Sequence, residues 1–405
     1  MINWVIHIIL LTALAILYFK KHNCSLSPFL FAGAYILKLA AGMAVGWIFF
    51  SHYGSGDTIV FFEKAKAMAA LPLNEYLDLL FSASNYEVSK EPRVLFFTKF
   101  LSLITFITSE SYWISSLYIS TMNFFATWFL VKVLKEIYPK IINASIICFL
   151  ILPSVVFWSS GILKDTFSFA AVSLLISSCL KLYHRKSVSI SEIILGLASL
   201  FILLKLKHYL LVSFFLFVGL LAFLTLIRKS NIKYKVLAIF ILILAFGSTQ
   251  FIHPYLKTDR LVQTIYENNQ SITQNTKQEN KLSIYIESPE ITSLVKEIPE
   301  ALHIGLFRPS LFDFTSGWGW FHKVENTILT FLFFLSILLL VKERPKIDFP
   351  LISASIFTIL ILAVLLALST PNFGTLVRYK NAFLPYFFLL CSILPYRFLL
   401  QKLDE

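Results

Sequence analysis

A single acid on a glycine-rich turn is the first candidate for chemistry. Asp57 follows Gly54-Ser55-Gly56, and these glycines let the backbone fold back closely. The apolar run just before them, Pro28 to Phe50, is long enough to cross a bilayer, so the carboxylate is expected at a membrane surface. There it can act as a general base on a group delivered from the lipid phase, worth typically about 10²–10⁴-fold in rate. The alternative is that Gly-Asp-Thr is ordinary helix N-cap chemistry.

Basic side chains that could hold an anion lie in other short loops. Arginine offers a planar fork that suits a phosphate, and cations on a leaving phosphate stabilise charge that develops in the transition state. The candidates for substrate or phosphate binding are Lys164, Asp165, Lys207, Arg308, Arg378 and Lys380. No cofactor is expected, and no metal either, because the four cysteines are scattered without metal-ligand spacing.

Each of these candidates also has a structural alternative. Lys164 and Asp165 could form an ion pair that closes a hairpin. Arg378 and Lys380 could anchor the last helix at the membrane interface. Arg308, beside a proline, could organise the end of a loop. The residue types therefore leave binding and structural roles open.

The composition is that of a membrane protein. Hydrophobic residues make up 57% of the 405 residues and charged residues only 14%, whereas soluble domains are about one quarter charged. The net charge of +12 comes from short basic clusters between apolar runs, the pattern that the positive-inside rule produces. We therefore expect membrane lipids as partners and no nucleic acid.

Eleven apolar runs are predicted to be membrane-spanning helices, since only closed hydrogen-bonding elements survive inside a bilayer. They are Ile2–Phe19, Pro28–Phe50, Tyr112–Val133, Ile142–Trp158, Thr166–Tyr183, Val188–Leu204, Tyr209–Ile227, Lys235–Ile252, Val324–Val341, Phe349–Leu368 and Ala382–Tyr396. The first lacks a basic n-region and a cleavage site, so a retained helix is expected rather than a signal peptide. We predict an all-α, polytopic transmembrane helix bundle that forms one integral membrane domain over residues 1–405.

The loop charges predict the orientation. If crossings alternate, most loop lysines and arginines fall on one side, which is then cytoplasmic. Lys20 and Lys21 also belong there only if the short apolar segment Val94–Thr108 does not fully cross, and Asp57 is then outside. If this segment does cross, Asp57 is cytoplasmic. We favour the first arrangement.

Two outer loops are then large. The first, residues 51–111, contains amphipathic stretches at Thr58–Ala70 and Leu73–Ala83. The second, residues 253–323, is the only long polar region of the chain. Its middle, Asn268–Lys281, is rich in Asn, Gln and Thr, and we expect it to be a mobile loop.

The layout resembles that of GT-C glycosyltransferases, polytopic membrane enzymes that use polyprenyl-phosphate-linked sugars. Gly56-Asp57 before Thr58–Ala70 is similar to the family's early acid in a first outer loop with interfacial helices. The segment 153–165 is similar to a hairpin of mannosyltransferase-like members. Arg378-Tyr379-Lys380 looks like the basic segment near the lipid phosphate in bacterial members. The chain departs from the family in having no acidic neighbour to Asp57 and one extra helix in front.

The resemblance implies inverting sugar transfer to a lipid-linked, glycan or protein acceptor at the periplasmic face of a bacterial inner membrane. Asp57 would be the general base, and Lys164, Arg378 and Lys380 would hold the phosphate. One alternative is a repeat-unit polymerase for surface polysaccharide, which would rely more on outer-loop arginines. Another is a transporter or lipid flippase, which requires charged or Gly/Pro-broken helices near the bilayer midplane. The predicted helices are almost uncharged inside, with Lys38 the main exception, and this favours surface chemistry.

Overall fold

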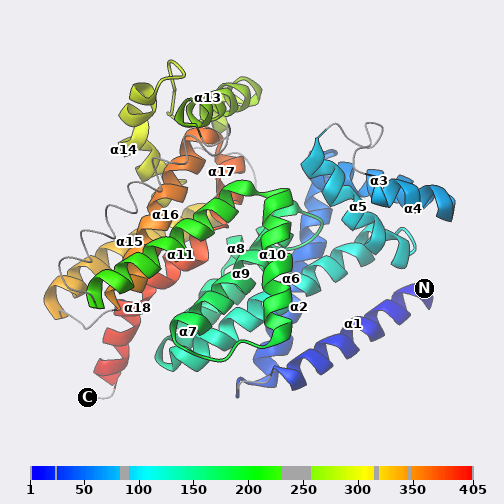
Figure 1. The fold of residues 1–405 in the computed structure, drawn as a ribbon, viewed down its shortest axis with the longest axis horizontal. Helices are drawn as coiled ribbons and strands as arrows, with labels where there is room; N and C mark the ends of the chain where they lie inside the picture. Colours follow the sequence, from blue (N-terminus) through cyan, green and yellow to red (C-terminus); the bar gives the residue numbers. More distant parts are fainter. Residues whose placement is uncertain are drawn as a thin grey trace. The chain divides into compact units, whose positions relative to one another are not determined.

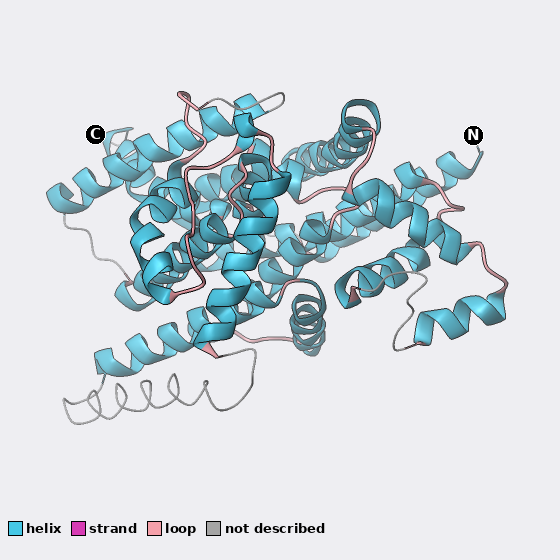
Figure 2. Cartoon of the chain, turned by 90° about the horizontal axis from the view of Figure 1, so that it is seen from above, coloured by secondary structure: helices cyan, strands magenta, loops and turns pink. Residues whose placement is uncertain are grey.

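The computed structural model describes residues 2–22, 25–82, 91–229, 257–313, 319–343 and 348–403. Regular structure in these ranges is helical (Figure 2), apart from one bridge between Lys281 and Asn372. Seven of the described helices are long and apolar enough to span a membrane. The prediction of a helical membrane protein is confirmed at this level. The chain divides into two compact units, residues 1–211 (unit 1) and 212–405 (unit 2), and each is described by itself.

The seven helices coincide with seven of the eleven predicted crossings. They are α1 (Ile2–Lys21), α2 (Pro28–Ile48), α6 (Tyr112–Ile137), α9 (Lys164–Tyr183), α11 (His208–Lys229), α15 (Trp320–Glu343) and α16 (Phe349–Ser369). Of the other four, Lys235–Ile252 lies outside the described residues. Two more coincide with α10 (Ile190–Leu206) and α18 (Leu384–Leu403), which are not among the seven.

The predicted crossing at Ile142–Trp158 is not one helix. After η2 (Pro139–Ile141), the chain forms α7 (Ile142–Ile146), a π-helical turn η3 (Ile147–Ile151) and α8 (Pro153–Trp158). Proline lacks the N–H that continues a helix, and it disfavours helical backbone in the residue before it. Leu152 accordingly has ψ 116°. The break divides this part of the bundle into two short pieces.

The first predicted outer loop folds as short helices at one end of unit 1 (Figure 1). After a π-helical turn, η1 (Phe49–Tyr53), come α3 (Asp57–Ala69), α4 (Leu73–Phe81) and α5 (Pro92–Ile107). The first two occupy the predicted amphipathic stretches. The apolar face of α3 closes over a core to which α5, α6 and α9 also contribute, including Phe61, Phe97, Ile119 and Phe167. We call this end of unit 1 the α3–α5 end.

The segment Val94–Thr108 lies within α5 and its C-cap, Thr108, and α5 is not among the seven helices long and apolar enough to span a membrane. The end of α2 and the start of α6 lie side by side. The rings of Phe50 and Tyr112 are 4.9 Å apart, and the hydroxyls of Thr58 and Tyr112 share a hydrogen bond of 2.7 Å. Because α2 ends beside the start of α6, the segment between them, with η1, α3, α4 and α5, begins and ends at the same end of unit 1.

Many buried side chains of unit 1 are hydroxyls. On α6 they include Ser115, Ser116, Ser120, Thr121 and Thr127, and on α9 Thr166, Ser168, Ser173 and Ser177. Thr121, Thr127 and Ser173 each donate to the carbonyl oxygen four residues earlier, at 2.8–2.9 Å. Such a hydroxyl is satisfied within its own helix. Polar residues can therefore be buried here without weakening the spanning helices' apolar character.

In unit 2, the long polar region contains the helices α13 (Thr258–Asn275), η5 (Gln278–Asn280) and α14 (Ile291–Phe307). The prediction of a mobile loop at Asn268–Lys281 is wrong for this reason. Asn269 is fully buried and donates to the Leu368 carbonyl at 2.8 Å, and Lys281 pairs with Asn372. The segment was interpreted as a loop because it is mostly polar, although its few apolar residues, such as Val262, have helical spacing.

Candidate active site

Asp57 is the first residue of α3, and its side chain is exposed. Gly56 before it has φ 142°, and a Cβ there would lie 2.6 Å from the Phe49 ring, so glycine is required. An acid in the first turn interacts favourably with the helix dipole. Thr58 anchors this turn through its hydrogen bond to Tyr112. Asp57 thus begins a helix, as the structural alternative for Gly-Asp-Thr predicts, and its catalytic role stays a prediction.

Lys164 reaches the same edge of α3. Its ammonium nitrogen lies 4.6 Å from the centre of the Phe61 ring. Phe61 follows Asp57 by four residues, and residues at this spacing lie on one helix face with Cβ atoms about 5–6 Å apart. An exposed carboxylate and a half-buried ammonium therefore lie along one edge of α3.

A buried ion pair lies next to Lys164 in the sequence and fixes the start of α9. Asp165 Oδ1 accepts from Lys207 Nζ, and the two side chains are 5% and 10% exposed. Asp165 lies in the first turn of α9, and Lys207 caps the last turn of α10. Each charge therefore suits the dipole of its own helix end. The pair ties two helix ends together and fixes the backbone that carries Lys164.

Three further basic residues lie at this end of unit 1. Arg93 lies in the first turn of α5, Lys205 lies in the last turn of α10, and His208 begins α11, all with exposed side chains. The Phe96 and Phe201 rings pack 5.7 Å apart and join α5 to α10, and the charges of Arg93 and Lys205 act on the His208 ring. We call Arg93, Lys164, Lys205 and His208 the basic rim. Sequence reasoning did not single out Arg93, since only the fold brings it to this place.

The loop Ser159–Leu163, within the segment 153–165 that was expected to form a hairpin, is buried against α2 and α6. Gly161 (φ 69°) donates its N–H to Ser120 Oγ at 2.9 Å. Asn123 Nδ2 donates to the Thr166 carbonyl at 2.7 Å. Gly42 makes the approach possible, because a Cβ there would overlap Ser120 Oγ. The loop thus enters the bundle instead of capping it.

Lys38 is buried beside this loop. It is 5% exposed, lies ten residues into α2, about 15 Å along the axis, and donates to Ser159 Oγ at 2.5 Å. Ser159 ends α8, where a cation is favourable for the helix dipole. An ionisable residue inside a spanning helix is a functional candidate by default. Its position in an apolar run was the signal, although the sequence alone did not supply its partner.

Unit 2 holds the other predicted residues. Arg308 Nε donates to both carboxylate oxygens of Asp313, at 3.0 and 3.2 Å, and its guanidinium lies 5.2 Å from the Phe373 ring. Burial would raise the pKa of Asp313, but hydrogen bonds from Arg308 and Ser310 outweigh it and lower the pKa. Arg308 thus organises the end of α14, the structural alternative considered for it.

Lys380 is the last residue of α17 (Phe373–Lys380) and is 1% exposed. Its ammonium donates to the carbonyls of Leu306 and Arg308 and to Asn326 Oδ1, at 3.0–3.1 Å. Burial lowers the pKa of Lys380 to about 7, although the nearby Glu325 charge raises it. Arg378 is half-buried two residues earlier, a spacing at which helical side chains do not face each other.

In unit 1 the structure therefore places Lys164 beside α3, the helix that Asp57 begins, and pairs Asp165 with Lys207. In unit 2 Lys380 donates to the Arg308 carbonyl, and Arg378 does not face Lys380 on α17. The roles assigned to all seven stay predictions. Among the described residues no group of three or more His, Cys, Asp or Glu is arranged to hold a metal ion. Unit 1 combines a carboxylate that can accept a proton with cations that can hold an anion.

Comparisons with protein-family models, with curated proteins and with solved structures gave no match to this chain.

Proposed function

We propose that the chain is a membrane-embedded, GT-C-like glycosyltransferase that takes its sugar from a polyprenyl-phosphate-linked donor. The observation that carries the proposal is the placement of Asp57 and Lys164 along one edge of α3. The other members of the basic rim lie on α5, α10 and α11, and the Asp165–Lys207 pair fixes the backbone that carries Lys164. Lys164 begins α9, a helix apolar and long enough to span a membrane, so apolar surroundings for a lipid-linked substrate adjoin it.

In this proposal Asp57 accepts the proton of an acceptor hydroxyl while its oxygen bonds to the anomeric carbon. The bond from that carbon to the phosphate oxygen breaks, and the sugar inverts. Lys164, Arg93 and Lys205 hold the departing polyprenyl phosphate, where negative charge develops in the transition state. The acceptor is a lipid-linked, glycan or protein hydroxyl, and the site faces the periplasm of a bacterial inner membrane.

The test is sugar transfer by purified protein in liposomes that contain polyprenyl-phosphate-linked hexoses or pentoses. We expect Asp57→Asn to lower the transfer rate by about 10²–10⁴-fold, the usual contribution of a general base. Lys164→Met is expected to raise the KM for the donor. Glu63→Gln is the matched control, since Glu63 is an exposed acid on the same helix. Equal activity of the Asp57 and Glu63 variants contradicts the proposed base.

A transporter or flippase is the second candidate, because Lys38 beside a proline-broken helix is the arrangement that class requires. In that case movement of a lipid-linked sugar between leaflets depends on Lys38, and Lys38→Met abolishes it while Asp57→Asn does not. The polymerase alternative relied on outer-loop arginines, and Arg308 is already held by Asp313.

A further inference from the structure

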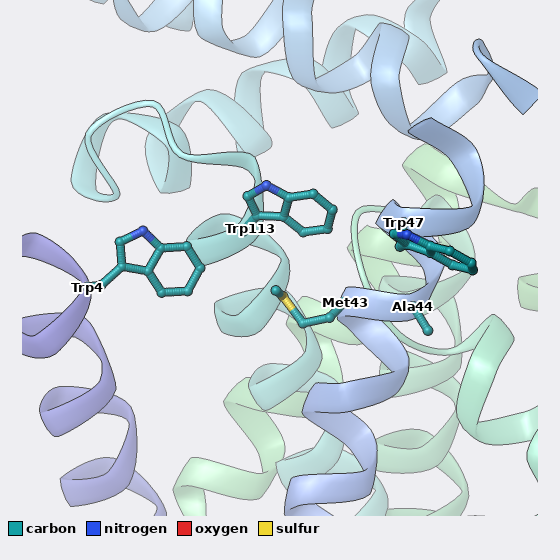
Figure 3. A pocket seen from close by; sticks show the side chains of 5 residues that line it. All are labelled: Trp4, Met43, Ala44, Trp47 and Trp113. Carbon is teal, nitrogen blue, oxygen red and sulfur yellow. The ribbon is translucent and has the colours of Figure 1, made fainter. Parts of the chain in front are cut away.

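An apolar groove of about 550 Å³ opens on unit 1 between three membrane-spanning helices. It is lined by Trp4 of α1, by Met43, Ala44 and Trp47 of α2, and by Trp113 of α6, and Figure 3 shows Trp4 and Met43 pointing toward each other beside Trp113. Charged side chains do not line it. Its volume lies within the range of small-molecule sites, roughly 300–1,000 Å³.

The tryptophans indicate the depth of the groove in the bilayer. Trp4 lies in the first turn of α1, Trp47 in the last turn of α2 and Trp113 in the first turn of α6. Tryptophan gathers at membrane–water interfaces, where its ring is apolar and its N–H is wet. The groove therefore lies where lipid chains meet their headgroups.

Helix α1 is fastened to α6 next to the groove but not across it. His7 Nδ1 lies 2.9 Å from the Tyr118 hydroxyl, and the Tyr18 hydroxyl donates to the Phe125 carbonyl at 2.7 Å. These bonds fix α1 from His7 onward. The preceding turn, with Trp4, stands apart from α2 and forms the open wall of the groove (Figure 3).

Neither water nor empty space suits this groove. A bound water needs two to four polar partners, which an apolar lining does not supply. An unfilled space loses the dispersion contacts of the atoms around it. Lipid chains are the apolar material present at this depth. We propose that the groove holds one acyl chain of a bilayer phospholipid as a resident lipid that joins α1 to α2 and α6.

The groove binds lipid whether or not the chain transfers a sugar. Its occupancy also supports the α3–α5 end, because Trp113 is adjacent to Tyr112, whose hydroxyl anchors Thr58. A lipid against Trp113 stabilises the start of α6, from which that hydrogen bond is made.

The test is native mass spectrometry of purified full-length protein that has been delipidated in detergent and then given dioleoyl phosphatidylglycerol. We expect wild type to retain one phospholipid. Ala44→Trp fills the groove and is expected to retain none. Ala32→Trp is the matched control, because it adds the same ring at an exposed position of α2. A wild type without bound lipid, or equal retention by both variants, overturns the proposal.

A second measurement covers the case in which Ala44→Trp does not fold. A benzophenone amino acid replaces Trp47 in one protein and Phe29, 89% exposed on the same helix, in another. After the same treatment, irradiation is expected to join phospholipid to position 47 and not to position 29. Equal yields at both positions overturn the proposal.

Discussion

The buried ion pair between Asp165 and Lys207 predicts a large and specific loss of stability. Removing one partner of a buried pair leaves an uncompensated charge and costs about 3–5 kcal/mol. Because both side chains are at most 10% exposed, solvent screening does not reduce this figure. Asp165→Asn or Lys207→Met should therefore shift the unfolding equilibrium of unit 1 by roughly a hundredfold to a few thousandfold.

The assay is unfolding in mixed micelles with a rising fraction of SDS. Opening of unit 1 is followed by thiol labelling of Cys148, which is 1% exposed, in a background without the other three cysteines. Lys132→Met is the control, since Lys132 and Glu136 form an i,i+4 pair with side chains 21% and 43% exposed. Such surface pairs contribute about 0–1 kcal/mol.

The double variant Asp165→Asn/Lys207→Met decides the cause. If an unpaired charge is what destabilises the single variants, the double variant is no less stable than either of them. The reasoning is refuted if the two single losses simply add, or if Asp165→Asn costs no more than Lys132→Met.

Three further predictions concern close packing and pH. Gly42→Ala should destabilise unit 1 by about 1–3 kcal/mol, because the added Cβ overlaps the Ser120 side chain. Gly33→Ala, on the same helix but in open space, should leave the stability unchanged. Thermal unfolding of the two variants checks this. Gly305→Ala should destabilise unit 2 in the same way, since its Cβ overlaps the Ala363 carbonyl; stability similar to that of Gly219→Ala contradicts this. In the folded protein the pKa of Lys380 is lowered to about 7. Between pH 7 and the higher pKa of Lys380 in the unfolded chain, the lysine is protonated in the unfolded state but largely neutral in the folded state. The free energy of unfolding therefore rises with pH in this range. Unfolding from pH 6.5 to 9 should show this rise, by at most about 1.4 kcal/mol per pH unit, and Lys380→Met should remove it.

Sequence reasoning found the elements that depend on local pattern. The seven spanning helices follow from apolar length, and α3 and α4 follow from amphipathic spacing. It missed what depends on distant partners. Pro153 is visible in the sequence, but apolar length alone favoured one helix through it. The polar stretch of α13 was assigned to a loop because its buried face is completed by Leu368, 99 residues after Asn269.

The candidate site shows the same division. The start of a helix at Asp57, after Gly56, depends on local residues and was one of the two alternatives considered for it. The proximity of Lys164 to Phe61, and the pairing of Asp165 with Lys207, 42 residues apart, require the tertiary fold. Arg308 was predicted as a phosphate ligand, yet its acid partner, Asp313, lies only five residues away. The acidic Asp313 shortly after Pro309 was a signal in the sequence that Arg308 could have a structural partner.

The contact between Lys38 and Ser159 has a consequence for biosynthesis. Helix hydroxyls such as that of Thr127 find their acceptor one turn away, as soon as their helix forms. Lys38 finds its acceptor 121 residues later. At about 5–20 residues per second, synthesis needs roughly 6–25 s to reach it. Alkali extraction of nascent chains arrested before and after residue 159 would show whether α2 is held more firmly once its partner exists. The buried lysine thus imposes an order on assembly, in which α2 stays beside water or the insertion machinery until α8 has been made.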